Sequence, residues 1–319
     1  MGIPTLNYFL RKKCSEGIRN IRLSYLTGKK IAIDASIYLY KYKGKGNIIE
    51  NMYIMCSIFK KYGIIPIFIF DGKPPPEKSG TIKRRRDKKN KAEADFNKLK
   101  EELNLCNSAA QRIQKIRQMK TLEKKFIRIN SKDISKVKTF LKCYGIRYFT
   151  ADGEADKCCA QLVHNNEAYA CLSEDMDLFA YGCPYVLRQL NLFEGRVFLY
   201  DLPKIINLLN INIQTFRQLC VLTGTDYSSF RYYKSFNYYY QLFKRYEKTK
   251  SPSFYLWLND NNLLPQTISK LQHTYSLFDI STSENQLLSY TKTSQPQMNC
   301  KELRKILEAE NFIFPPPAT

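Results

Sequence analysis

Two apolar runs that each end in an aspartate constrain the fold of this chain most strongly. Residues 30–33 lead into Asp34, and residues 64–70 lead into Asp71, and both runs predict buried β-strands. Residues 36–62, between the two runs, carry apolar side chains at helical spacing. This order predicts an α/β fold with a mainly parallel central sheet, in which functional sites form at the carboxyl ends of the strands. For Asp71 alone, an ordinary turn before the following prolines is an equally good interpretation.

Four more carboxylates lie close together in the middle of the chain. Glu154 and Asp156 open a predicted helix, whereas Asp175 and Asp177 follow a short predicted strand at 168–172. Residues two apart in an extended segment point the same way, so Asp175 and Asp177 can share one site. Glu154 and Asp156 can share it only if the site lies off the end of their helix. Acids in a first helical turn also suit the helix dipole without any functional role.

The charge of the chain points to a polyanionic partner. Of its 319 residues, 51 are Lys or Arg and 29 are Asp or Glu, which gives a net charge of +22. Nucleic acid is the simplest partner for such a surplus. Residues 78–128 alone contain 17 basic and six acidic residues in two helical stretches. A solvated face is the ordinary interpretation, but the position between acid-bearing strands predicts a basic helical arch over an acidic site.

The cysteine and histidine content excludes some classes of site. The ten cysteines form no CxxC pair, and the two histidines are His164 and His273, so we expect no zinc site. Cysteines scattered along apolar segments are typical of reduced thiols in an intracellular protein. The longest apolar run is too short to span a membrane, so no membrane partner is expected.

The last third of the chain predicts mostly helices. Residues 186–200 predict a β-hairpin, and residues 202–222 predict a helix. Residues 231–257 mix aromatic and basic side chains, which suits nucleic-acid binding but is equally consistent with a packed core. We therefore expect a core over residues 1–230 with the arch inserted at 78–128, a helical region at 231–314 and a tail at 315–319.

Seven motifs occur in the order that is typical of one known family. They are Met1-Gly2-Ile3, Ile33-Asp34-Ala35-Ser36, Phe70-Asp71-Gly72-Lys73-Pro74-Pro75, Lys78-Ser79-Gly80, Gly153-Glu154-Ala155-Asp156, Glu174-Asp175-Met176-Asp177 and Gly224-Thr225-Asp226-Tyr227. Together they resemble the flap endonucleases of the structure-specific 5′-nuclease family, the XPG/Rad2-like nucleases. The resemblance runs from residue 1 to about 230 and, more weakly, to about 313.

The resemblance implies a fold and an activity. The fold is a PIN-like α/β nuclease core with a helical arch and a C-terminal helical DNA-binding region. The activity is Mg²⁺-dependent cleavage of branched or flapped DNA, by a 5′-flap endonuclease and 5′–3′ exonuclease of DNA replication, repair or recombination. Two Mg²⁺ ions, which Mn²⁺ can replace, would be held by seven acids: Asp34, Asp71, Glu154, Asp156, Asp175, Asp177 and Asp226.

The ligand set divides between the two ions. The first four acids would hold one ion, and the last three, with Asp156 near the middle, would hold the other. Asp156 stands where the family usually has a glutamate, so its carboxylate is one methylene shorter. The residues themselves support cations at this place, because seven crowded carboxylates would repel one another strongly without them. Two hard cations would also supply the nucleophile and the charge relief that phosphodiester cleavage needs.

The resemblance also implies contacts with DNA. Lys78 and Arg85 match arch residues that contact the scissile phosphate, and Tyr40 matches a tyrosine that stacks on the terminal base. Gly2, at the processed N-terminus, is expected near the same site. Further DNA contacts are expected from basic side chains, namely Arg84, Arg86, Lys88, Lys89, Arg231 and Lys234.

Some features depart from the family. The family carries a Gly-Ile-Gly hairpin that grips duplex DNA, often through K⁺, but residues 228–237 contain no glycine. A sliding-clamp motif is not seen either, and we expect a monomer. Shortened members of this kind occur in large DNA viruses, so the expected location is the nucleus or a viral replication site in the host cell. The alternatives are a catalytically inactive DNA-binding or scaffold protein and a 5′–3′ exoribonuclease.

Overall fold

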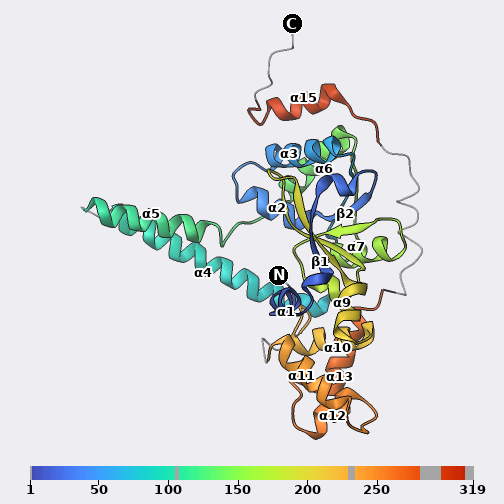
Figure 1. Cartoon of the computed structure of the whole chain (residues 1–319). Helices are drawn as coiled ribbons and strands as arrows, with labels where there is room; N and C mark the ends of the chain where they lie inside the picture. The colour runs from blue at the N-terminus through green and yellow to red at the C-terminus, as the bar shows by residue number, and fades with distance from the viewer. Residues whose placement is uncertain (1, 105–107, 229–233, 281–295, 313–319) are drawn as a thin grey trace.

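A seven-stranded sheet lies at the centre of the molecule (Figure 1). The structure is a computed structural model that describes residues 2–104, 108–228, 234–280 and 296–312. The strand order is β1-β7-β6-β5-β2-β3-β4, with β2 to β6 parallel and with antiparallel pairs at β6–β7 and β7–β1. The strands are β1 (Ile18–Arg22), β2 (Lys30–Asp34), β3 (Ile65–Phe70), β4 (Arg147–Thr150), β5 (Ala170–Leu172), β6 (Tyr185–Asn191) and β7 (Arg196–Asp201). The predicted α/β fold with a mainly parallel sheet is confirmed.

Helices cover both faces of the sheet, which explains why the central strands are apolar throughout. In β2, Ile31 and Ile33 contribute to the core on one face, whereas Ala32 contributes to the core on the other. The first face is covered by α2 (Ala35–Lys43), α3 (Ile48–Lys61) and α6 (Ser131–Tyr144). The second face is covered by α1 (Leu6–Lys13), α7 (Ala155–His164), α8 (Asp177–Ala180), α9 (Leu202–Leu209) and α10 (Ile213–Thr223). Short 3₁₀ turns occur at Ser15–Gly17, Leu23–Leu26 and Pro76–Lys78.

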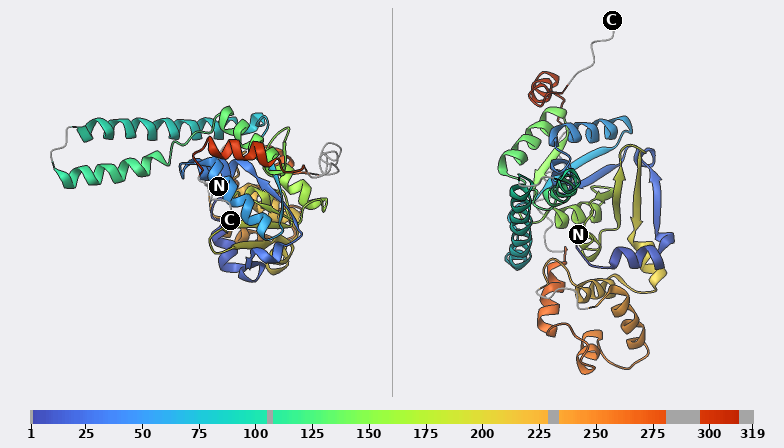
Figure 2. Two further views of the ribbon diagram at one scale, coloured as in Figure 1. Left: turned by 90° about the horizontal axis from the view of Figure 1, so that it is seen from above. Right: turned by 90° about the vertical axis from the view of Figure 1, so that its left-hand side faces the viewer.

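The predicted basic arch is a pair of antiparallel helices, α4 (Ser79–Asn104) and α5 (Ala109–Glu123), which project from the body of the molecule (Figures 1 and 2). Along α4 only Thr81 and Ala92 are buried, and α5 buries none of its residues. Just after α5 ends, the ring of Phe126 lies 5.4 Å from the ring of Phe96 in α4. The arch is therefore a largely solvated structure whose basic side chains remain available to a ligand.

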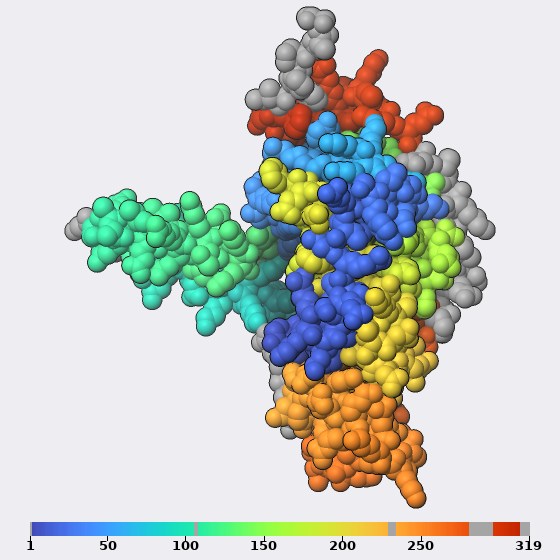
Figure 3. Space-filling view, in the orientation of Figure 1, coloured from blue at the N-terminus to red at the C-terminus, as the bar shows by residue number. Residues whose placement is uncertain are grey.

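The helices after α10 form two separate groups. α11 (Phe236–Tyr246), α12 (Phe254–Asp260) and α13 (Ile268–Leu277) form a lobe at one end of the molecule (Figures 1 and 3). Aromatic residues of the 231–257 segment pack inside this lobe, since Phe236 and Tyr239 are fully buried. The last described helix, α15 (Cys300–Glu308), lies instead against α6 at the opposite end.

Two parts of the predicted secondary structure are wrong. The first strand expected from the sequence is the one that leads into Asp34, but β1 forms before it, after α1, and pairs with β7 at the edge of the sheet. Its sequence, Ile-Arg-Asn-Ile-Arg, does not alternate apolar and polar residues, so it carries no strand pattern. The single helix predicted at 202–222 is divided into α9 and α10, because Asn210 adopts a left-handed backbone with φ of +50°. Across the described residues, none of the helices has the length and apolar character needed to cross a membrane.

Candidate active site

The acids predicted for the site gather at the carboxyl ends of the parallel strands. Asp34 ends β2, Asp71 follows β3, and Glu154 and Asp156 lie at the start of α7. We define the acidic cavity as a hollow of about 520 Å³ lined by five of the seven acids, together with Tyr40, Lys78 and Arg85. Those five acids are Asp34, Asp71, Glu154, Asp156 and Asp175.

Asp34 and Asp71 are held by a shared serine at the ends of two neighbouring strands. The backbone N–H of Ser36 donates to Asp34 Oδ1 at 3.0 Å, which caps the start of α2. The hydroxyl of the same serine donates to Asp71 Oδ2. Asp34 Oδ2 accepts from the hydroxyl of Ser173 at 3.0 Å, and Asp71 Oδ1 accepts from the N–H of Ala155 at 2.9 Å. Strand ends and helix starts thus fix both carboxylates.

Gly72 brings the end of β3 against the segment that leads into α7. Its N–H donates to the carbonyl of Gly153 at 2.7 Å, and a Cβ atom at this position would lie 1.9 Å from the carbonyl oxygen of Ala151. Only glycine permits so close an approach of two backbones. This contact places Asp71 beside Glu154, although the two residues are distant in the sequence.

Replacing Gly72 with alanine is expected to lower the free energy of unfolding by about 1–3 kcal/mol, the usual cost of overpacking. The added methyl group must push the two backbones apart, because the atom it meets is a carbonyl oxygen. Urea unfolding monitored by circular dichroism measures this loss. Gly153→Ala is the matched control, since a Cβ there would have no heavy atom within 4 Å. Equal stabilities of the two variants would contradict the prediction.

Asp175, Asp177 and Asp226 are linked by their own backbone groups. The N–H of Asp177 donates to Asp175 Oδ1 at 3.0 Å, and the N–H of Asp226 donates to Asp177 Oδ2 at 3.3 Å. The prediction that Asp175 and Asp177 meet because they lie on an extended segment is wrong, since Asp177 is the first residue of α8. A hydrogen-bonded turn, rather than the alternation of a strand, brings these two carboxylates together.

Gly2 lies against this group, as predicted. Its φ is +71°, and a Cβ atom there would lie 2.1 Å from Asp175 Oδ1 and 2.7 Å from the backbone nitrogen of Asp177. A side chain at this position would therefore displace the carboxylates. The absence of a side chain lets the N-terminal segment close one side of the acidic group.

The carboxylates are buried close enough together to disfavour full ionisation. Burial, with the charges of Asp71 and Asp175, raises the pKa of Asp34 to about 7. Burial and neighbouring carboxylates likewise raise the pKa of Asp156 and of Asp177 well above the ordinary value. Asp156 Oδ1 and Asp177 Oδ1 are buried oxygens that have no hydrogen-bond partner among the described residues. Such a set of hard oxygen donors fits divalent cations of the Mg²⁺ type.

Two basic side chains of the arch segment neutralise part of this charge. Lys78 Nζ pairs with Glu154 Oε1 and lies 3.3 Å from Asp226 Oδ2. Arg85 donates from one nitrogen to both oxygens of Asp226, at 2.8 and 2.7 Å. Burial alone would lower the pKa of Lys78, but the charges of Glu154 and Asp226 outweigh it and raise this pKa.

These ion pairs also affect where a cation can bind. Among the residues that the structure describes, no three His, Cys, Asp or Glu side chains stand in a geometry that would already hold a metal ion. A divalent cation at Glu154 or Asp226 would therefore compete with Lys78 and Arg85 for the same oxygens.

The other residues predicted to contact DNA lie outside the acidic cavity or at its edge. Tyr40 lines the cavity with 43% of its surface exposed, and Lys89 Nζ lies 4.4 Å from the centre of its ring. Arg84 donates to Thr81 Oγ1 within α4. The remaining four are the exposed Arg86, Lys88 and Lys234, and Arg231, which lies outside the described residues.

Several polar residues of the site were not predicted. Ser36 and Ser173 hold Asp34, and Thr81 donates to the carbonyl of Asp226 at 2.7 Å, which ties the arch to the site. Tyr227 donates to Glu154 Oε2. Single hydroxyl residues carry no pattern in one sequence, so the usable signals were the positions of Ser36 and Tyr227 inside the motifs of Asp34 and Asp226.

Comparisons with known proteins agree with the geometry. The XPG N-terminal domain matches residues 1–92 and the XPG I-region matches residues 145–226, which together make up more than half of the chain. Flap endonuclease 1 of Meyerozyma guilliermondii is 32% identical over 246 residues, which cover 71% of this chain and 63% of that protein. The chain thus spans less than two thirds of the length of this relative.

Solved structures show the same fold. The catalytic core of Rad2 in complex with a DNA substrate aligns with a TM-score of 0.67 at 20% identity, over 97% of this chain and 95% of that chain. Flap endonuclease-1 from Methanococcus jannaschii aligns with a TM-score of 0.64 at 22% identity, over 93% of this chain and 91% of that chain. These likenesses establish the PIN-like α/β nuclease fold.

Proposed function

Because this chain belongs to the XPG/Rad2-like flap endonuclease family, we propose that it is a divalent-metal-dependent nuclease that cuts branched DNA. Its activities are 5′-flap endonuclease and 5′–3′ exonuclease, in DNA replication, repair or recombination. The observation that carries the proposal is the acidic cavity, in which carboxylates from four separate chain segments face Lys78 and Arg85 of the arch segment.

The residues fit two Mg²⁺ ions, which Mn²⁺ can replace. Asp34, Asp71, Glu154 and Asp156 would hold one ion, and Asp175, Asp177 and Asp226, with Asp156 between, would hold the other. When bound, such ions supply a nucleophile from water at neutral pH and relieve the charge that develops on the phosphate. The buried oxygens of Asp156 and Asp177 that lack partners support this assignment.

Three side chains around the acidic cavity, Lys78, Arg85 and Tyr40, would position the DNA. Lys78 and Arg85 reach the carboxylates from the arch side, so a phosphate that enters the cavity meets both positively charged side chains together. Their positive charge would stabilise the negative charge that grows on the phosphate oxygens in the transition state. Tyr40, at the mouth of the cavity, offers an aromatic face on which a terminal base can stack.

The basic surface supplies affinity for DNA. Arg84, Arg86, Lys88 and Lys89 follow one another along the start of α4, where they can neutralise successive phosphates. The proposed partner is flapped or branched DNA, bound by a monomer. The proposed place of action is the nucleus or a viral replication site in the host cell.

A cleavage assay tests the function. The protein is incubated with labelled flap DNA, single-stranded DNA and RNA, with Mg²⁺ or with EDTA. Mg²⁺-dependent cleavage at the base of the 5′ flap is expected. Binding without cleavage of any substrate would favour the inactive scaffold, and preferential digestion of RNA from its 5′ end would favour the exoribonuclease.

The grip on duplex DNA is expected to depend on total salt rather than on the identity of the monovalent cation. The segment at 228–237 lacks the glycines whose carbonyls would hold K⁺, and residues 229–233 lie outside the described residues. Exposed side chains such as Lys234 and Arg245 would act instead as point charges. Affinity should then fall by about one log unit per log unit of salt for each phosphate neutralised.

Fluorescence anisotropy with flap DNA in KCl and in NaCl at matched ionic strength measures this dependence. Equal affinities in the two salts are expected. A clear preference for K⁺ would show that a different loop geometry restores the ion site.

A further inference from the structure

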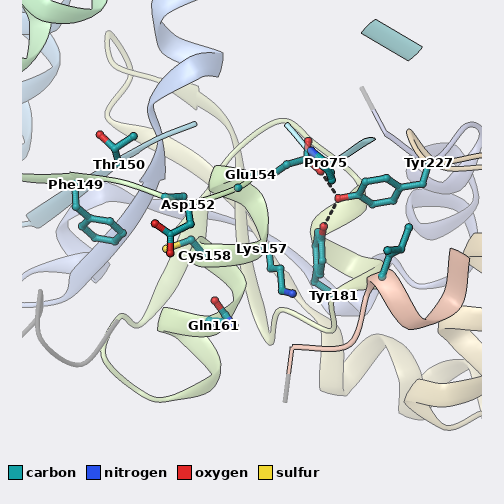
Figure 4. Close-up of a pocket in the computed structure, with 13 residues that line it drawn as sticks. Pro75, Phe149, Thr150, Asp152, Glu154, Lys157, Cys158, Gln161, Tyr181 and Tyr227 are labelled. Atoms are coloured by element: carbon teal, nitrogen blue, oxygen red, sulfur yellow. Dashed lines mark hydrogen bonds between the residues drawn. The ribbon is translucent and has the colours of Figure 1, made fainter. Parts of the chain in front are cut away.

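Glu154 stands between two cavities. Its Oε1 pairs with Lys78 on the side of the acidic cavity, whereas its Oε2 accepts a hydrogen bond from the hydroxyl of Tyr227. Tyr227 lines a second cavity of about 320 Å³, shown in Figure 4, to which Phe149, Lys157 and Tyr181 also contribute. The two oxygens of one carboxylate are thus directed to opposite sides.

Tyr227 is itself held in one orientation. Its hydroxyl lies 2.6 Å from the hydroxyl of Tyr181, which is 1% exposed (Figure 4). Both rings pack against Phe278, with centroids 5.3 Å away for Tyr227 and 4.8 Å away for Tyr181. A phenol keeps its proton at neutral pH, so Tyr227 is the donor toward the carboxylate of Glu154.

The second cavity leaves room for other rotamers of the Glu154 side chain. A glutamate side chain has three rotatable bonds, and partners on both oxygens select one rotamer from many. Without the donor on Oε2, only the ion pair of Oε1 with Lys78 holds the carboxylate, which can then turn toward the second cavity and away from the other acids. Outer partners of metal-binding carboxylates hold their ligands in this way in many metal sites.

We propose that Tyr227 is a positioning residue for the cleavage reaction: its hydroxyl, backed by Tyr181, holds Glu154 in the rotamer that directs one oxygen into the acidic cavity. The role rests on the proposed function, because Glu154 matters as a ligand only if the acidic cavity binds cations. Tyr227 itself touches neither cation nor DNA in this role, and it acts through Glu154 alone.

The test compares Tyr227→Phe with a matched control. Phenylalanine keeps the ring contact with Phe278 and removes only the hydroxyl. Tyr255→Phe removes a buried hydroxyl of α12 for which the described part of the chain offers no hydrogen-bond partner. Tyr227→Phe is expected to weaken Mn²⁺ binding by about 10–100-fold in calorimetry, and to lower the single-turnover rate on flap DNA by a similar factor at fixed Mn²⁺. Tyr255→Phe should leave both unchanged.

A double-mutant cycle with Glu154→Gln separates positioning from a general loss of structure. If Tyr227 acts only through Glu154, the Tyr227→Phe change should cause no further loss of Mn²⁺ affinity in the Glu154→Gln background. The proposal would be overturned if Tyr227→Phe weakened Mn²⁺ binding as much in the Glu154→Gln background as in the wild type. It would also be overturned if Tyr227→Phe alone kept the wild-type Mn²⁺ affinity. If the wild type binds Mn²⁺ but cuts no DNA, the proposed function fails, and the calorimetric cycle still decides the role of Tyr227.

Discussion

Replacing Asp175 or Asp177 with alanine is expected to abolish cleavage while leaving the affinity for flap DNA in Ca²⁺ largely unchanged. Both side chains are 4% exposed and lie in the hydrogen-bonded group that would hold the second cation. The chemistry would depend on those cations, whereas affinity would come from the basic surface of the arch. Loss of the two-metal site should lower the rate of cleavage far more than the loss of one ordinary side-chain contact does.

Single-turnover cleavage and fluorescence anisotropy measure the two effects separately. Asp260→Ala, which removes an exposed acid at the end of α12, is the control and should cut normally. The free energy of unfolding should change little in Asp177→Ala, because removing the buried, unpartnered Oδ1 offsets the loss of the hydrogen bond from the Asp226 N–H to Oδ2. Cleavage within about tenfold of the wild type would exclude the assignment of these acids to the metal site.

The parts of the fold that sequence predicted well are those with a strong local pattern. β2 and β3 are apolar because both of their faces are buried, and each carries its aspartate to the same edge of the sheet. β1 has no comparable pattern, because it lies at the sheet edge and its two isoleucines stand three residues apart among arginine and asparagine. Its position is set by pairing with β7, a contact across most of the chain.

The residues of the site also divide into those that the sequence predicted and those that it did not. Six of the seven acids stand at the ends of predicted strands or at the start of a predicted helix, and the family motifs implied the full set, which includes Asp226. The groups that orient them were not predicted, since Ser173 reaches Asp34 and Tyr227 reaches Glu154 across long stretches of sequence. Such contacts depend on the packing of α7 and α8 on the sheet, which one sequence does not specify. Sequence therefore indicates which groups carry the chemistry better than it indicates what holds them.

Replacing Lys78 or Arg85 with alanine is expected to lower the single-turnover rate by about 10²–10³, the usual loss for one electrostatic stabiliser of a transition state. The two side chains converge on Asp226 from the arch side, so a phosphate held against the acids would lie within their reach. Lys88→Ala, which removes an exposed lysine from the same helix, is the control. It should weaken DNA binding without slowing cleavage at saturating enzyme.

The ion pairs of Lys78 make a second measurement decisive. Because Lys78 occupies Glu154 Oε1 and lies 3.3 Å from Asp226 Oδ2, it competes with any cation that binds there. Lys78→Ala should therefore bind Mn²⁺ more tightly than the wild type in the absence of DNA, even though it cuts more slowly. Weaker Mn²⁺ binding together with slower cleavage would mean that Lys78 organises the acids. An unchanged rate at saturating enzyme, with weaker DNA binding, would make it a contact that only positions the DNA.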